Sequence, residues 1–381
     1  MTQILAANLD HLRAFILKIT MQFGLLRAIF CDRPLRLLVL FLISSAFSLS
    51  LALAFPLWLL AIGPLVYGIP HLFSSVRYFH YTVSSKSKVK TQRPDSGWLI
   101  FAAVFSIMTV LAVYRIILTF GLVQIDPSHL SEWKGASGGE LIALVLTVIV
   151  TTLGYRQSIL KGIMGTLLLM PLFAALVVSP YVTVGVLILV HNFVGFGYWY
   201  LASKTLKEKG VVVFAGLSTL LITALIFSGW FDAYCPFFKP EDELPFAHLN
   251  FADLGRMVFP WTDNPSTWIH VAIVYAYSQA VHYYVWLKAI PDQHHVNEIP
   301  TSFKQSLRLM EDDFGAWGAR FAIVLSIAGM GTWFFLNFYQ ARIVYFCIAG
   351  YHGYLEIAGL ALILVGFSSR RRTPPYLAMP Q

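Results

Sequence analysis

Residues 37–71 read LLVLFLISSAFSLSLALAFPLWLLAIGPLVYGIPH and contain no charged side chain. A helix needs about 20 apolar residues to cross the hydrocarbon core of a bilayer, so this stretch is too long for a single crossing. Pro56 interrupts it, and a proline breaks or kinks a helix because it lacks a backbone N–H. The stretch therefore predicts two consecutive membrane-spanning helices that are divided near Pro56.

The whole 381-residue chain has the same character, with 57% hydrophobic and 12% charged residues and only three cysteines. A soluble domain carries about 25% charged residues, so that class is excluded, as are disordered chains and disulfide scaffolds. Transmembrane strands are shorter and alternate in polarity, whereas the apolar runs here are long and uniform. We therefore expect an all-α integral membrane protein. The ten expected spans cover residues 36–55, 57–80, 97–123, 140–156, 159–178, 181–202, 211–231, 268–290, 316–338 and 343–367.

The 27 lysines and arginines predict the orientation of these spans. With a cytoplasmic N-terminus, ten spans place 22 basic residues on the cytoplasmic side and five on the outer side. This distribution follows the positive-inside rule and makes both termini cytoplasmic. The net charge of +8 therefore indicates a multi-pass protein of the inner membrane in contact with lipid headgroups, and no nucleic-acid partner is expected.

Three segments flank or interrupt the expected bundle of residues 31–369. Residues 1–30 carry apolar side chains at three- and four-residue steps with basic ones between them. This pattern predicts a basic amphipathic helix that lies on the cytoplasmic leaflet or docks against another membrane subunit. Residues 232–267 form a long outer loop, which is acidic and rich in Phe, Trp and Pro and is expected to act as a lid. Residues 370–381 are expected to form a cytoplasmic tail.

Four histidines lie deep inside the expected spans, whereas His80 and His270 lie at span boundaries; the four are His71, His191, His282 and His352. Ionisable side chains are costly in a membrane and usually face the bundle interior, so each is a candidate functional residue. All four lie on even-numbered spans, which run from outside to inside. At about 1.5 Å per residue they fall within a slab about 12 Å thick. Four imidazoles near one depth predict a joint metal or haem site in the core of the bundle.

The residues near the first two histidines fit such a site. The two prolines of GPLVYGIPH, residues 63–71, should kink the helix and free backbone carbonyls near its histidine. In HNFVGFGYW, residues 191–199, Gly195 and Gly197 permit close helix approach or leave room for a bound ligand.

The other two histidines have polar neighbours one helical turn away. Gln279 precedes His282 by three residues, and Glu356 follows His352 by four, so each pair lies on one helix face. Glu356 is the acidic residue deep inside a span. We expect it to ligate a metal or, in preference, to orient a ligating imidazole from outside the coordination sphere, and Gln279 to act in the same supporting way.

Imidazole ligands suit iron, copper and zinc, whereas magnesium and calcium need several oxygen ligands. One interpretation is a non-haem iron with an open position for oxygen, acting on an apolar substrate that enters from the lipid. A second interpretation is b-type haem with histidine axial ligands in an electron carrier. A non-catalytic transporter or structural subunit of a membrane complex is the third.

Three of the histidine windows resemble the Brp/Blh family of membrane β-carotene 15,15′-dioxygenases. The windows are GIPH with His71, HNF with His191 and AVHYY with His282. The resemblance implies a multispan bundle that binds iron through four histidines and cleaves β-carotene to retinal. Trp286 stands where the family has a further histidine, and His352 is the candidate replacement from another helix. The combined expectation is an iron-dependent membrane oxygenase that acts on a carotenoid or lipid.

Overall fold

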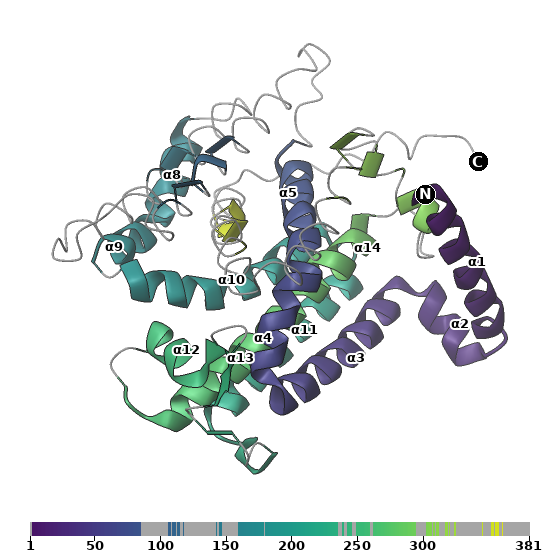
Figure 1. Cartoon of the computed structure of the whole chain (residues 1–381). Helices are drawn as coiled ribbons and strands as arrows, with labels where there is room; N and C mark the ends of the chain where they lie inside the picture. The colour runs from purple at the N-terminus through teal and green to yellow at the C-terminus, as the bar shows by residue number, and fades with distance from the viewer. Residues whose placement is uncertain are drawn as a thin grey trace.

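The computed structural model describes 2–84, 159–178, 180–234, 238–239, 242–245, 249–259, 262–294 and 302–306, with scattered residues within 106–146 and 308–360 (Figure 1). The described residues are mostly helical, which confirms the helical class. The strands among them are β1 (Glu243–Leu244) and β2 (Leu249–Asn250), which pair antiparallel. The expected spans 97–123, 140–156, 316–338 and 343–367 lie largely outside the described residues, and the tail 370–381 lies entirely outside them.

The N-terminal segment forms two helices, α1 (Thr2–Thr20) and α2 (Gly24–Cys31), in place of the single helix predicted for residues 1–30. The break follows from two weak helix formers. The Thr20 hydroxyl donates to the Ile16 carbonyl, and Gly24 costs about 1 kcal/mol in a helix interior relative to alanine. Apolar side chains of α1 are exposed, including Phe15 at 62%. Leu25 and Leu26 of α2 are exposed as well, at 74% and 40%, so exposed apolar side chains continue across the break.

The next two helices are α3 (Arg33–Ala54) and α4 (Pro56–Gly63), which confirms the predicted break at Pro56. The side chain of Asp32 accepts a hydrogen bond from the Leu35 amide (3.0 Å) and caps α3 at its N-terminus. After α4 the chain continues through the π-helical turn η1 (Pro64–Gly68) into α5 (Ile69–Ser84). The axis bends by 46° across this junction, as its prolines predicted.

In the described segment from residue 159 to residue 234 the helices are α8 (Ile159–Leu168), α9 (Met170–Val178), α10 (Pro180–Ala202) and α11 (Leu206–Phe227). The predicted span 159–178 is thus divided at Leu169, beside Pro171, which supplies no N–H to the preceding turn. A capping box begins α11, because Thr205 accepts from the Glu208 amide and the Glu208 carboxylate accepts from the Thr205 amide.

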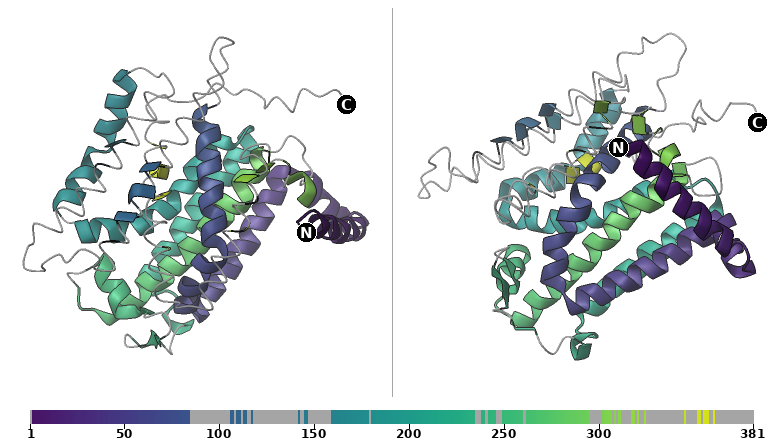
Figure 2. Two further views of the ribbon diagram at one scale, coloured as in Figure 1. Left: turned by 45° about the horizontal axis from the view of Figure 1, so that its top comes forward. Right: turned by 45° about the vertical axis from the view of Figure 1, so that its right-hand side comes forward.

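The helix α13 (Pro265–Tyr284) lies at the centre of the packing and continues through the π-helical turn η4 (Val285–Ala289) into α14 (Ile290–His294). It packs against α3, α4, α10, α11 and α12 (Phe251–Val258), and Figure 2 shows it running between these helices. All residues from 271 to 278 are buried, so every face of this helix is covered. The predicted outer loop 232–267 holds η2 (Asp232–Tyr234), the two strands and α12.

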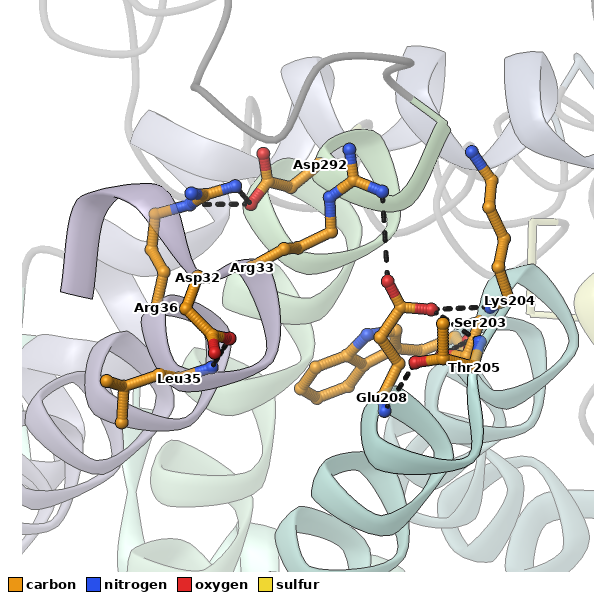
Figure 3. A network of polar contacts seen from close by, with 10 residues as sticks. Asp32, Arg33, Leu35, Arg36, Ser203, Lys204, Thr205, Glu208 and Asp292 are labelled. Atoms are coloured by element: carbon orange, nitrogen blue, oxygen red, sulfur yellow. Dashed lines mark hydrogen bonds and ion pairs between the residues drawn. The ribbon is translucent and has the colours of Figure 1, made fainter. Parts of the chain in front are cut away.

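Buried ion pairs join the ends of α3, α11 and α14 (Figure 3). The Arg36 guanidinium donates to one oxygen of Asp292 through Nε (3.1 Å) and Nη2 (3.0 Å). Arg33 lies 3.7 Å from the Glu208 carboxylate, the same carboxylate that completes the capping box. These contacts link residues more than 170 positions apart in the chain.

Within the described residues, two helices, α3 and α11, are long and apolar enough to cross a membrane, and the bent pair α4–α5 adds a third if it counts as one span. These helices indicate a membrane protein. The count of ten spans and the orientation stay predictions.

Candidate metal site

The four histidines predicted from the sequence meet in one cluster. Their ring centroids are 4.4 Å apart for His71–His352, 4.9 Å for His191–His282, 5.1 Å for His71–His282 and 5.2 Å for His191–His352. His71, His282 and His352 are at most 3% exposed, whereas His191 is half-buried. The residues come from α5, α10, α13 and the described part of the chain beyond residue 345, so tertiary packing alone brings them together.

His71 is oriented by the π-helical turn that precedes it. Its Nδ1 lies 2.8 Å from the Gly68 carbonyl, the last residue of η1. A carbonyl oxygen can only accept, so Nδ1 carries the ring proton and Nε2 holds the free lone pair. The predicted kink is present, and a backbone carbonyl lies within hydrogen-bond distance of this histidine.

Two further histidines have the same arrangement. The Nδ1 atom of His282 lies 3.3 Å from the Asn192 carbonyl, and that of His191 lies 3.3 Å from the Leu187 carbonyl. His282 is followed by the second π-helical turn, η4, and π-helical turns recur at functional sites. Three imidazoles are therefore held by main-chain acceptors in the tautomer that leaves Nε2 available to ligate.

The donor atoms lie near the spacing that a metal site requires. The Nε2 atoms of His71 and His352 lie 2.7 Å apart. One donor atom from each of His71, His282, His352 and Glu356 falls within 4.8 Å of all the others. Bonds of about 2.0–2.2 Å to one ion separate its ligand atoms by about 3–4 Å, so small side-chain shifts would seat an ion here.

Glu356 completes the tightest donor group, in which His191 is not included. Its carboxylate is 1% exposed and lies 3.6 Å from Nε2 of His352. Neither carboxylate oxygen makes a hydrogen bond of good geometry with a described residue, although the Trp286 indole N–H lies close to the carboxylate, and Nε2 of His282 also lacks such a partner. Buried polar atoms without partners are costly, and a bound cation would satisfy all three.

Gln279 is connected to the histidine cluster through Tyr283. Its amide donates to the Tyr283 hydroxyl (3.0 Å), and the Tyr283 ring packs 5.0 Å from the His71 ring. No hydrogen bond between Gln279 and a histidine occurs within the part of the chain that the structure describes. Its predicted supporting role would therefore act through Tyr283.

Glycines allow the helices around the site to approach closely. A Cβ atom on Gly195 would lie 3.2 Å from Nε1 of Trp286, and one on Gly197 would lie 3.1 Å from Leu360. A Cβ on Gly353 would lie 3.5 Å from the His191 ring. The predicted role of the first two glycines in close packing is confirmed.

Two polar residues of the site were not predicted. Asn192 supplies the carbonyl that fixes His282, and its side-chain amide donates to Ser278 (3.0 Å). The sequence contained a signal for each residue. An asparagine in an apolar span is costly to bury, which marks Asn192, and Ser278 precedes His282 by one helical turn.

No protein-family model, curated protein or solved structure matches this chain. Its function is therefore inferred from the chemistry of the site.

Proposed function

We propose that this chain is a multi-pass membrane metalloprotein that binds non-haem iron and oxidises an apolar substrate, such as a carotenoid or a lipid. The observation that carries the proposal is the set of imidazoles whose Nδ1 atoms are held by backbone carbonyls. Their Nε2 atoms, with the Glu356 carboxylate, share one buried volume. Such an arrangement has the form of a metal site whose ligands are oriented before the ion binds.

The ligand types favour a transition metal. Imidazole nitrogen with one carboxylate suits iron, zinc or copper, and two histidines with one carboxylate and open positions are the ligand set of non-haem Fe(II) oxygenases. His71, His282 and His352 would hold the ion, with either Glu356 or His191 as the fourth ligand. Iron supplies the redox chemistry when bound, while the chain fixes the imidazole tautomers and excludes water.

The crowding of the rings favours a single ion over haem. Two axial histidines hold haem iron at about 2 Å each, with a flat macrocycle between their Nε2 atoms. Here the Nε2 atoms of His71 and His352 are 2.7 Å apart, and two more imidazole rings pack against the pair. A macrocycle would have to displace these rings.

The surroundings of the site favour an apolar substrate. Trp286 and Tyr283 are buried, and their rings lie 6.4 Å from the His282 ring and 5.0 Å from the His71 ring. A polar substrate would lose its hydration at such a site without gaining hydrogen bonds. The Brp/Blh resemblance suggests β-carotene as the first compound to assay.

Metal analysis of the purified full-length protein tests this proposal. We expect about one iron per chain and loss of most of it in the double variant His191→Ala/His282→Ala. His270→Ala is the matched control, because His270 pairs with Asp232 (2.7 Å) outside the cluster and its loss should leave the metal in place. A wild-type protein without iron, copper or zinc, or full occupancy in the double variant, would refute the metal site.

The reaction is tested separately. Incubation of the iron-loaded protein with β-carotene and dioxygen in detergent should yield an oxygenated product, with dioxygen as the oxidant, and product formation should require the intact cluster. A Soret band in the purified protein would instead establish the haem interpretation and contradict non-haem iron.

A further inference from the structure

Helix α1 presents an exposed apolar stripe along one face. The stripe consists of Leu12, Phe15, Ile16 and Ile19, which recur at three- and four-residue steps and are 44–62% exposed. Leu25 extends the exposed apolar surface onto α2. Single exposed apolar side chains are common, but a contiguous patch of them marks a surface that contacts a partner or a membrane.

Two hydrogen bonds fix the rotation of α1. The Asp10 carboxylate accepts from the amides of Phe303 (2.7 Å) and Lys304 (3.1 Å), which joins α1 to the 302–306 segment. At about 100° per residue, Asp10 lies about 170° from the centre of the apolar stripe. The contact that holds α1 on the rest of the chain therefore directs the stripe away from that chain.

Basic side chains border the stripe. Arg13 and Lys18 each lie about 110° from its centre, on opposite sides. Arg13 interacts with Asp10, so part of its charge is balanced within α1, whereas Lys18 is exposed. A basic side chain at the border of an apolar face lies along that face and places its charge among lipid headgroups. An apolar face with a basic border and an acidic residue opposite is typical of a helix in the membrane interface.

The position of α1 agrees with this interpretation. Figure 1 and both views of Figure 2 show α1 lying across the N-terminal end of α3 and not along its axis. The Arg33–Glu208 pair joins that end of α3 to the start of α11, so the polar ends of the two candidate spans lie at one level. A helix that lies across a span at its polar end is in the plane of the bilayer surface.

We propose that α1 and α2 form an in-plane membrane anchor, whose apolar stripe enters the boundary between headgroups and acyl chains of one leaflet. The lipid surface is the occupant of the stripe, because the stripe lies at the polar ends of the spans and its basic border matches anionic headgroups. The Asp10 contact would transmit the position of the anchor to the 302–306 segment. The anchor is independent of the metal chemistry proposed above.

Spin labels on the full-length protein in lipid nanodiscs test the anchor. The labels are placed at Phe15→Cys and at Ala14→Cys, with Cys31→Ser, Cys235→Ser and Cys347→Ser as the background. Ala14 is the matched control, because it is also exposed but lies about 150° from the centre of the stripe. The label at position 15 should lie about 5–10 Å below the phosphates, where oxygen broadens its signal and a water-soluble nickel chelate does not. The label at position 14 should meet the chelate. Equal accessibility at the two positions would overturn the proposal, and exclusion of both reagents at position 15 would show a protein partner instead.

Hydrogen exchange in the same nanodiscs is a second test, and it keeps the native cysteines. Burial of one Phe or Ile side chain contributes about tenfold or more to an equilibrium, so the amides of α1 should exchange at least about tenfold faster in Phe15→Glu/Ile19→Glu. Ala7→Glu/Ala14→Glu is the control, because it adds the same charge to exposed positions outside the stripe. Unchanged exchange in the first variant, or an equal increase in the control, would overturn the proposal.

Discussion

Breaking the buried Arg36–Asp292 ion pair at one side is expected to be among the most destabilising single changes in the bundle. Both side chains are 3% exposed, and the guanidinium also donates to the Phe30 carbonyl. Removing one partner of a buried pair leaves the other charge uncompensated and costs about 3–5 kcal/mol. We expect Asp292→Asn to lie near the lower limit, because an amide oxygen can still accept from Arg36. Arg36→Met should lie near the upper limit, because all three of its hydrogen bonds are lost.

The double variant Arg36→Met/Asp292→Leu separates the interaction from the cost of burial. Replacing both charges with apolar side chains of similar volume is often neutral, so we expect the double variant to be more stable than either single variant. The exposed pair His270–Asp232 provides the control. Asp232 is 57% exposed, and Asp232→Asn should change stability by at most about 1 kcal/mol.

Reversible unfolding in mixed micelles, followed by tryptophan fluorescence across an SDS titration, measures these differences. An Asp292→Asn variant that unfolds within about 1 kcal/mol of the wild type would refute the reasoning. The same conclusion would follow from a double variant that is as unstable as the sum of the two single variants, because the two side chains would then act independently.

Three further predictions concern the site and its supports. Glu356→Gln should lower iron affinity about 10- to 100-fold in chelator competition, and unchanged affinity would exclude the carboxylate from the site. Desolvation opposes ionisation of Asp10, but hydrogen bonds from two amides of the 302–306 segment outweigh it and lower its pKa. In a hydrogen-exchange measurement, these two amides should therefore exchange more slowly in the wild type than in Asp10→Asn at pH 6. The difference should disappear as the pH falls below about 4, and a difference that survives at pH 2 would contradict this. Gly195→Val should cost about 1–3 kcal/mol by crowding η4. Gly210→Ala, which meets nothing within 4 Å, should be neutral or stabilising in the same unfolding assay.

Local chemistry made several features predictable. The break at Pro56 and the bend before His71 follow from prolines that lack an N–H, wherever the helix packs. The histidines were identifiable because an ionisable group in an apolar span is costly and rarely retained without a role. The breaks near Thr20 and Leu169 were not predicted, because hydropathy alone does not register a weak helix former or a nearby proline inside an apolar run.

The sequence by itself determined the helical membrane class and the set of histidines, since both depend on the polarity of individual residues. Only the tertiary structure decided that Glu356 joins His71, His282 and His352 in the tightest donor group, while His191 stands beside it. It also decided that Arg36 pairs with a carboxylate 256 residues away. Helical periodicity relates residues three or four positions apart, whereas contacts between distant segments depend on which helices are neighbours and how each is rotated. Close packing sets both the neighbours and the rotation of a helix, as where Trp286 lies against the backbone of Gly195. The distant residues of the metal site therefore meet only when the bundle has formed.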